Sequence, residues 1–276
     1  DYSNDTAAAV AKGPLDNERF RHAAGGSADF GYFGGGEPSP GQSSKTSRID
    51  YSNDTATAVA KGNLSAARES LAGTQSSDSV YFGGGRNPVF STVDRMDFSS
   101  DTSNYSAKGP LSAVRHSLAA VSARGRGLPT TRTVTVNYSP GTVATSNMGY
   151  FVAGRQTATN PNWESIVDRI DYSNDTATAV AKGPLATRTQ RNSAVSSGIH
   201  GYAMGGENPA SSPSNLSLVQ RIDYLNDTAT ASPKGPLSLA RQYVAATGNK
   251  DFGYTVGGSP GPTRVDRIDY ANDTAA

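Results

Sequence analysis

The residues best suited to acid–base or metal chemistry do not form a matched set in this sequence. The three histidines, His22, His116 and His200, fall at unrelated positions and share no ligand spacing, and there is no cysteine. The few glutamates are scattered along the chain. Because catalysis needs a nucleophile, acid or base held beside its partners, we predict that the protein is not an enzyme and that it holds no metal or cofactor.

Opposite charges do recur at a fixed spacing, in an Arg-x-Asp motif that an aromatic residue such as Tyr172 follows. The copies are Arg48/Asp50, Arg95/Asp97, Arg169/Asp171, Arg221/Asp223 and Arg267/Asp269. Side chains two residues apart on a strand leave the same face. We therefore interpret each pair as part of a charge-assisted ladder that joins neighbouring units, rather than as a ligand site.

Glycine clusters such as Gly34-Gly35-Gly36 are the other candidates for chemistry, because glycine-rich loops can cradle phosphate. Here they lack the Lys-Ser/Thr pair and the helix that a phosphate loop needs. The Ser-Asn-Asp-Thr segments also do not match the spacing of a calcium loop. Both features are better explained as turns between strands.

One phrase repeats along the whole chain and defines its organisation. An Asp-Tyr or Asp-Phe landmark returns at intervals of roughly 50 residues, except for one longer interval. Between landmarks lies an aromatic run that ends in glycines, such as residues 81–85. We predict a single domain, 1–276, with repeat units 1–49, 50–96, 97–170, 171–222 and 223–268 and a partial unit 269–276.

Each unit is predicted to contain four short strands. Representative strands are residues 68–74, 80–83 and 92–98, with residues 56–61 as an example of the fourth. The Ser-Asn-Asp-Thr turn joins the third strand to the fourth, with residue types that tolerate positive φ and bond their own backbone. Gly, Pro and β-branched residues interrupt every window long enough for a helix.

The order of an Arg, a hydrophobic strand, a Gly-Gly doublet and a Tyr-bearing strand resembles the kelch repeat, and the resemblance covers the whole chain. It implies an all-β, kelch-like β-propeller of four-stranded blades. The sequence departs from the kelch pattern because Ala or Val replaces the Trp of the fourth strand, and the only Trp, Trp163, lies elsewhere. We therefore expect tight packing between blades through Ala and Gly, or a smaller propeller.

Five aromatic segments, four ending in a glycine doublet and one in Ala153-Gly154, predict five blades. Residues 6–12 match a fourth strand, so we expect them to pair with 267–270 and close the ring, although 272–276 begin a competing fourth strand. The third unit carries about 25 extra residues, 124–148, which we interpret as an inserted hairpin with a strand at 131–138. A degenerate sixth blade is the alternative interpretation of this insertion.

Charge and hydropathy exclude two classes of partner. Lys and Arg number 25 against 24 for Asp and Glu, a net charge of +1, so strong electrostatic capture of nucleic acid is not indicated. No apolar run approaches the ~18 residues that a membrane-spanning helix needs. We predict neither a nucleic-acid partner nor a membrane span.

The phrase from Ile170 to Leu185 also resembles the kelch-like repeats in virion structural proteins of marine bacteriophages, most of all those that infect cyanobacteria. That resemblance implies a structural or binding role at the virion surface or in the extracellular space, in a tail, fibre or decoration. The implied partners are other virion or extracellular structural proteins and a host-surface glycan or protein, with a homo-oligomer also open. The alternatives are a carbohydrate-binding or carbohydrate-active propeller and a cellular kelch-type adaptor.

Binding residues are expected where the repeats differ from one another, because loops between strands form contact surfaces. The candidates in these variable segments are Glu37, Arg86, Arg124, Arg126, Arg155, Asn162, Trp163 and Glu207.

Overall fold

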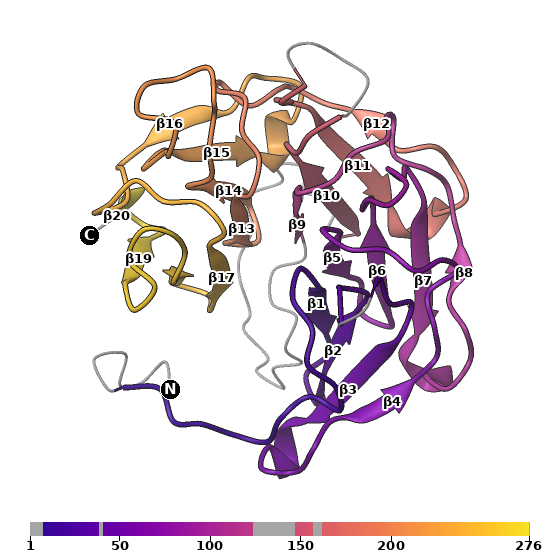
Figure 1. The fold of residues 1–276 in the computed structure, drawn as a ribbon. Helices are drawn as coiled ribbons and strands as arrows, with labels where there is room; N and C mark the ends of the chain where they lie inside the picture. The colour runs from indigo at the N-terminus through magenta and orange to yellow at the C-terminus, as the bar shows by residue number, and fades with distance from the viewer. Residues whose placement is uncertain (1–7, 39–40, 124–146, 157–161, 276) are drawn as a thin grey trace, which may run out of the picture.

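The computed structural model describes residues 8–38, 41–123, 147–156 and 162–275. These residues form five antiparallel sheets, each with four strands in chain order. The sheets surround a common centre like blades, and the first strand of each blade lies innermost (Figure 1). The chain is therefore a five-bladed β-propeller, which confirms the predicted fold class.

The strands of the five blades have these bounds. Blade 1 contains β1 (Ala23–Gly26), β2 (Phe30–Gly34), β3 (Thr46–Asp50) and β4 (Val59–Lys61), and blade 2 contains β5 (Ala72–Gln75), β6 (Ser79–Gly83), β7 (Val93–Asp97) and β8 (Ser106–Ala107). Blade 3 contains β9 (Ala119–Ser122), β10 (Met148–Val152), β11 (Val167–Asp171) and β12 (Val180–Ala181). Blade 4 contains β13 (Ser193–Ser196), β14 (His200–Met204), β15 (Val219–Asp223) and β16 (Ser232–Lys234), and blade 5 contains β17 (Ala245–Gly248), β18 (Phe252–Val256), β19 (Val265–Asp269) and β20 (Thr274–Ala275).

The pairing between second and third strands is the same in every blade. The tyrosine of the second strand lies opposite the arginine of the third: Tyr32–Arg48, Tyr81–Arg95, Tyr150–Arg169, Tyr202–Arg221 and Tyr254–Arg267. Residues directly opposite in an antiparallel pair point to the same face of the sheet. Each blade therefore presents a tyrosine and an arginine together on one face.

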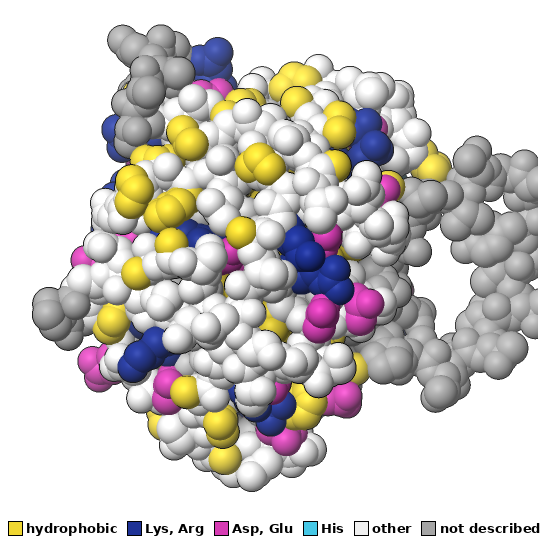
Figure 2. Space-filling model, turned by 90° about the vertical axis from the view of Figure 1, so that its right-hand side faces the viewer, with side chains coloured by type: hydrophobic (Ala, Val, Ile, Leu, Met, Phe, Trp, Pro, Cys, Tyr) yellow, Lys and Arg dark blue, Asp and Glu magenta, His cyan; other side chains and the backbone are white. Residues whose placement is uncertain are grey.

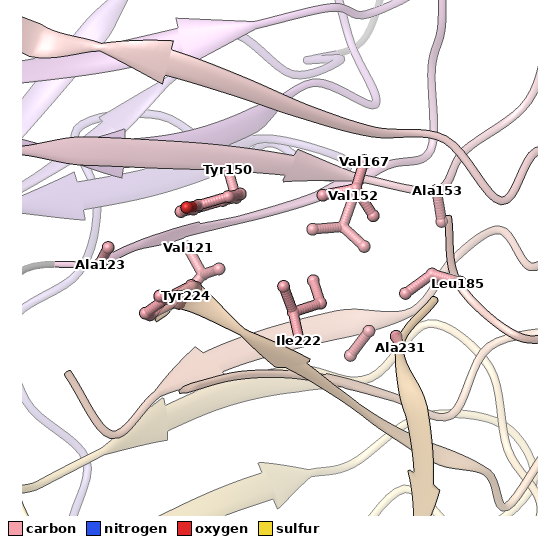
Figure 3. Packing of buried hydrophobic residues seen from close by; sticks show 11 residues of the cluster. Val121, Ala123, Tyr150, Val152, Ala153, Val167, Leu185, Ile222, Tyr224 and Ala231 are labelled. Carbon is pink, nitrogen blue, oxygen red and sulfur yellow. The ribbon is translucent and has the colours of Figure 1, made fainter. Parts of the chain in front are cut away.

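The hydrophobic core lies between blades rather than inside one. At the junction of blades 3 and 4, Tyr150 and Val167 pack against Ile222 and Tyr224 (Figure 3). The rings of Tyr150 and Tyr224 are stacked, with centroids 4.8 Å apart. The tyrosine of one blade stacks in the same way on the landmark aromatic of the next at Tyr32–Phe98, Tyr81–Tyr172 and Tyr202–Tyr270. Each such pair adds about 0.5–1.5 kcal/mol beyond the area it buries.

The link from each blade to the next passes so close to the following turn that only glycine fits. A Cβ on Gly62 would lie 1.8 Å from the carbonyl oxygen of Ser103, and one on Gly109 would lie 1.7 Å from that of Ala177. The short side chains Ala179 and Ala231, which lie just before β12 and β16, are buried. The expected close packing between blades through Gly and Ala is thus present.

The turn after the third strand differs from its expected conformation. Tyr51–Asn53 form a single 3₁₀ turn, and the Asp50 carboxylate accepts a hydrogen bond from the Ser52 amide. Positive φ occurs in this turn at Asp273 (φ 55) of blade 5, and it recurs in all five blades two residues after the Arg, or Thr189 in blade 4, that precedes the first strand, for example at Ser70 (φ 56). This bend also shortens the first strand, which was expected at 68–74 but spans Ala72–Gln75.

The predicted closure of the ring by the N-terminal strand is wrong for the part that the structure describes. Residues 8–12 lie in no strand, and the outer edge of β19 pairs at Ile268 and Asp269 with β20. The N-terminal segment crosses the open side of the ring between blades 5 and 1 (Figure 1). The competing fourth strand expected near 272–276 is the one that forms.

The predicted hairpin strand at 131–138 lies outside the described residues, as do residues 124–146 of the segment in which a degenerate sixth blade was the alternative. Among the residues that are described, no helix is long and apolar enough to cross a membrane.

Candidate binding face

The loops that precede the first strand and follow the second strand meet at one end of the propeller, because these strands are antiparallel neighbours. Isolated β-bridges join the two loops at Glu69–Arg86, His116–Arg155 and Gln190–Glu207. One residue of each pair follows the Arg (Thr189 in blade 4) before the first strand, and the other follows the glycine doublet or its Ala-Gly counterpart. We call this end of the molecule the loop face.

A chain of backbone hydrogen bonds connects the blades at the loop face. The amide of Ser70 donates to the carbonyl of Arg21, Ser117 to Ser70, Arg191 to Ser117 and Tyr243 to Arg191, all at 2.8–2.9 Å. These five residues occupy one repeat position and all have φ of 53–57°. This chain of hydrogen bonds fixes the backbone of the loop face and so positions the side chains beside it.

In blades 1 and 2 the loop face carries a carboxylate pair bridged by arginines. Arg21 Nη1 lies 3.0 Å from Glu37 and 3.2 Å from Glu69, which also accepts from Arg86 and from Asn87. Burial alone would raise the pKa of Glu69, but hydrogen bonds with Glu37, Arg86 and Arg21 lower it. The pKa of Glu37 is raised by its hydrogen bond with Glu69, by burial and by charge repulsion from Glu69.

In blade 3 the centre of the loop face is a buried histidine among arginines. Burial, and then the charges of Arg86, Arg155 and Arg191, lower the pKa of His116 to about 4. Its Nδ1 lies 2.9 Å from the hydroxyl oxygen of Ser117. A base this weak is poorly suited to deprotonate a serine at neutral pH. The imidazole is therefore neutral at pH 7.

Beside this histidine, the backbone of Arg155 forms isolated β-bridges with the backbones of both His116 and Trp163. With its amide oxygen turned toward the guanidinium, Asn162 accepts hydrogen bonds from Arg155 at 3.0 and 3.3 Å. The Trp163 side chain is half-buried, and its indole nitrogen is buried. An arginine, an amide and an indole thus lie together at this point of the face.

Blade 4 contributes a third charged group. Glu207 accepts from Arg191 at 2.5 Å and from Gln190 at 2.6 Å, and Arg191 also donates to Gln242 at 2.9 Å. Arg191 stacks over the Tyr243 ring, with its guanidinium carbon 4.6 Å from the centroid. The blade 4 residues are therefore linked to blade 5 by polar contacts.

The candidate binding residues within the described part of the chain all lie on the loop face: Glu37, Arg86, Arg155, Asn162, Trp163 and Glu207. Arg124 and Arg126 lie outside the described residues. The sequence reasoning missed Arg21, Glu69, His116, Gln190 and Arg191, which complete the face. A signal was present, because all five come directly after, or two residues after, the Arg or Thr that precedes a first strand.

Four of the five arginines of the repeated motif lie in the blade junctions, away from the loop face. Arg48 donates to Asp101 of blade 2 at 2.6 Å, and Tyr32 and Lys61 also bind this carboxylate. The same arrangement brings Arg95 to Asp175, Arg169 to Asp227 and Arg221 to Asp273. The arginine thus crosses to the next blade, but its acceptor is the aspartate of the Asn-Asp-Thr or equivalent turn.

The landmark aspartates were expected in this ladder and instead hold their own turns. Asp171, Asp223 and Asp269 accept from the backbone amide two residues later, at 2.9–3.0 Å. Asp97 differs, since it accepts from Arg95 and from Ser79. Arg267 lies over the Phe252 ring, 4.6 Å from its centroid. Tyr172 stacks on Tyr81.

A second ion pair is buried within most blades and holds the loop after the glycine doublet. Arg115 binds Asp168 at 2.6 Å and donates to the carbonyl oxygens of Ala153 and Ile166. Arg68–Asp94 and Arg241–Asp266 repeat this pair, and all four side chains are nearly fully buried. In blade 4 both partners change together, to Thr189 and Gln220, so that no buried charge is left unpaired.

Charged side chains are few on the visible surface. On the side of the molecule in Figure 2, basic and acidic side chains lie beside one another instead of forming a patch of one sign. Within the described ranges, no three His, Asp or Glu residues are placed to hold a metal ion. The loop face offers paired charges, amides and aromatic rings, which are groups suited to reversible recognition.

Comparisons of the chain with models of protein families and with curated proteins find no match.

Proposed function

We propose that this chain is a non-enzymatic binding propeller whose loop face recognises a partner at the surface of a virus particle or in the extracellular space. The observation that carries the proposal is that repeated and variable side chains lie in different parts of the molecule. Side chains repeated in each blade are engaged in blade junctions, as at Arg169–Asp227, whereas side chains that differ between blades gather on the loop face. Loops held by a rigid scaffold are the usual place for recognition.

The chemistry of the loop face supports binding rather than catalysis. Its histidine has a lowered pKa, and its carboxylates at Glu69 and Glu207 are each paired with an arginine. Arg155 and Trp163 lie opposite each other in a backbone β-bridge, and both residue types are frequent at the centre of binding interfaces. The wording of the repeat, which resembles that of cyanobacterial phage virion proteins, favours a host-surface glycan or protein as the partner.

The proposal is tested with fluorescently labelled protein and intact marine cyanobacterial cells, together with a glycan array. Arg155→Glu and Trp163→Ala are expected to lower binding at least tenfold, because truncating a central anchor removes about 2 kcal/mol or more. Lys250→Glu and Leu225→Ala change exposed residues at the opposite end of the propeller and serve as matched controls. Equal binding by all four variants, with unchanged melting temperatures, would refute a role for the loop face.

A further inference from the structure

Arg155, on the loop face of blade 3, carries a charge that no carboxylate balances among the described residues. Within those residues it forms no ion pair, and the two undescribed stretches of its repeat unit, 124–146 and 157–161, contain no Asp or Glu. The residues at the same position in the other blades are uncharged or bound to an opposite charge: Glu37 to Arg21, Arg86 to Glu69, Glu207 to Arg191, and Ser259 without a charge. The loop face is thus electrically balanced in the other blades and positive in blade 3.

Arg155 lies in the middle of a row of three residues. Its backbone forms antiparallel β-bridges with that of His116 on one side and that of Trp163 on the other. Residues directly opposite in an antiparallel pair point to the same face. One ligand beside Arg155 can therefore reach an imidazole and an indole ring as well.

The electrostatic potential around this row is positive. Burial, and then the charges of Arg86, Arg155 and Arg191, lower the pKa of His116, and the opposing charge of Glu69 has a smaller effect. Guanidinium groups from blades 2, 3 and 4 are thus close enough to act on one imidazole. An anion bound at this point is attracted by all three.

Two nitrogen atoms of the row are without hydrogen bonds among the described residues. With its amide oxygen turned toward the guanidinium, Asn162 accepts from Nε and Nη2 of Arg155, and Nη1 has no acceptor there. His116 bonds the Ser117 hydroxyl through Nδ1, and its Nε2 likewise has no partner in the described part of the chain. In the neutral tautomer that accepts from Ser117, Nε2 carries the proton. Nη1 and Nε2 are then both donors.

The third member of the row supplies an apolar surface. The Trp163 side chain is half-buried, and its indole nitrogen is among the buried atoms. The part of this side chain that meets solvent is therefore carbon. An aromatic surface of this kind packs well against the C–H groups of another ring.

We propose that the loop face binds an acidic sugar, a uronic or sialic acid residue within a glycan, through its carboxylate at Arg155. The inference rests on the proposed function and names the ligand chemistry of the same face. Nη1 of Arg155 and Nε2 of His116 donate to the carboxylate, in hydrogen bonds strengthened by its charge. Trp163 packs against the sugar ring.

The charges and neighbours of Arg155 favour this ligand over other anions. A phosphate monoester carries nearly two negative charges at neutral pH, whereas only one guanidinium here is without a carboxylate among the described residues. An acidic peptide brings several charges, which Glu69 and Glu207 would repel. Sugar hydroxyls both donate and accept hydrogen bonds, as do the neutral groups beside Arg155, the Asn162 amide and the Ser117 hydroxyl.

The experiment measures binding of the 276-residue protein to an array of uronate- and sialate-bearing glycans. Each acidic glycan is paired with its carboxyl-reduced form, in which the carboxylate has become a primary alcohol, and sulfated glycans and acidic peptides are included. We expect at least one acidic glycan to bind, and carboxyl reduction to weaken that binding about tenfold or more, because hydrogen bonds to a charged group are lost.

Three variants test whether Arg155 is the group that reads the carboxylate. Arg155→Gln should bind the acidic glycan and its reduced form equally, and Arg155→Lys should keep part of the preference, because an ammonium group keeps the charge but not the planar fork. Lys250→Gln removes one positive charge at the opposite end of the propeller and should keep the full preference. Melting temperatures confirm that each variant is folded.

The outcomes separate this inference from the proposed function. No binding to any acidic glycan, equal binding to acidic and reduced forms, tighter binding to sulfated glycans or acidic peptides, or a preference that survives in Arg155→Gln would each overturn it. If Trp163→Ala still lowers binding to intact cells in any of these cases, the proposed function stands and only the acidic sugar is wrong. If no loop-face variant changes binding to cells or glycans, both fail.

Discussion

Arg48 of blade 1 donates a hydrogen bond to Asp101 of blade 2, with Nη1 and Oδ2 2.6 Å apart. Tyr32 and Lys61 of blade 1 bind the same carboxylate, at 3.1 and 3.0 Å. One aspartate therefore gathers donors from three strands of the preceding blade. The arrangement recurs at Asp175, Asp227 and Asp273, so it is the polar counterpart of the stacked aromatic rings that join the same blades.

Replacing a turn aspartate inside the array should destabilise the protein strongly. Asp227→Ala leaves Tyr150, Arg169 and Lys182 without their shared acceptor, and we expect a loss of about 2–4 kcal/mol in the free energy of unfolding. Denaturation in urea measures the change. Asp54→Ala is the matched control at the exposed end and should lose less than about 1 kcal/mol. Equal losses in the two variants would contradict the assigned role.

The buried pair Arg115–Asp168 should depend on both partners being present. Arg115→Thr alone leaves the Asp168 carboxylate buried without its cation, and we expect a loss of about 3–5 kcal/mol. The double variant Arg115→Thr/Asp168→Gln copies the residues of blade 4 and should recover most of this loss. A double variant no more stable than the single one would show that the pair does not act as a unit.

His116 should make the protein less stable in acid. Its folded-state pKa of about 4 lies below the ordinary value of 6.5, so the unfolded chain takes up the proton first as the pH falls. Stability that is complete above pH 6.5 is then lost progressively toward pH 4, by about 1–2 kcal/mol after allowance for solvent screening.

The control for this acid effect is His116→Gln, which introduces the residue found at the same position in blades 4 and 5, Gln190 and Gln242. Urea denaturation at several pH values should show a flatter profile for this variant between pH 6.5 and 4. Identical pH profiles for the two proteins would mean that His116 is not the group responsible.

Much of the fold was predictable because the same strand and turn preferences recur in every repeat unit. The aromatic run and the third strand each appear five times, and the glycine doublet appears four times with one Ala-Gly counterpart, so their strand and turn preferences reinforce one another. The acceptor of the arginine ladder was not predictable in the same way. Asp50 stands two residues from Arg48 and looks like its partner, but a 3₁₀ turn after β3 assigns that carboxylate to the Ser52 amide.

The loop face could be predicted only in part. Loops that differ between repeats identified Arg155 and Glu207, but Glu69 and His116 lie in a segment that looked like strand. Their position depends on a bend with positive φ at Ser70 and Ser117, residues that carry no glycine signal for it. Ring closure by the N-terminal strand is not seen in the described residues. Residues 8–12 and 272–275 both carry the pattern of a fourth strand, and this pattern does not say which of them pairs with β19.

The most direct test of the division between scaffold and recognition compares the melting temperatures of two arginine variants. Arg169→Ala removes a junction contact to Asp227 and should lower the melting temperature by about 4–8 °C, at 2–4 °C for each kcal/mol lost. Arg155→Ala alters the loop face and should change it by less than about 2 °C. A larger fall for Arg155→Ala than for Arg169→Ala would contradict the account.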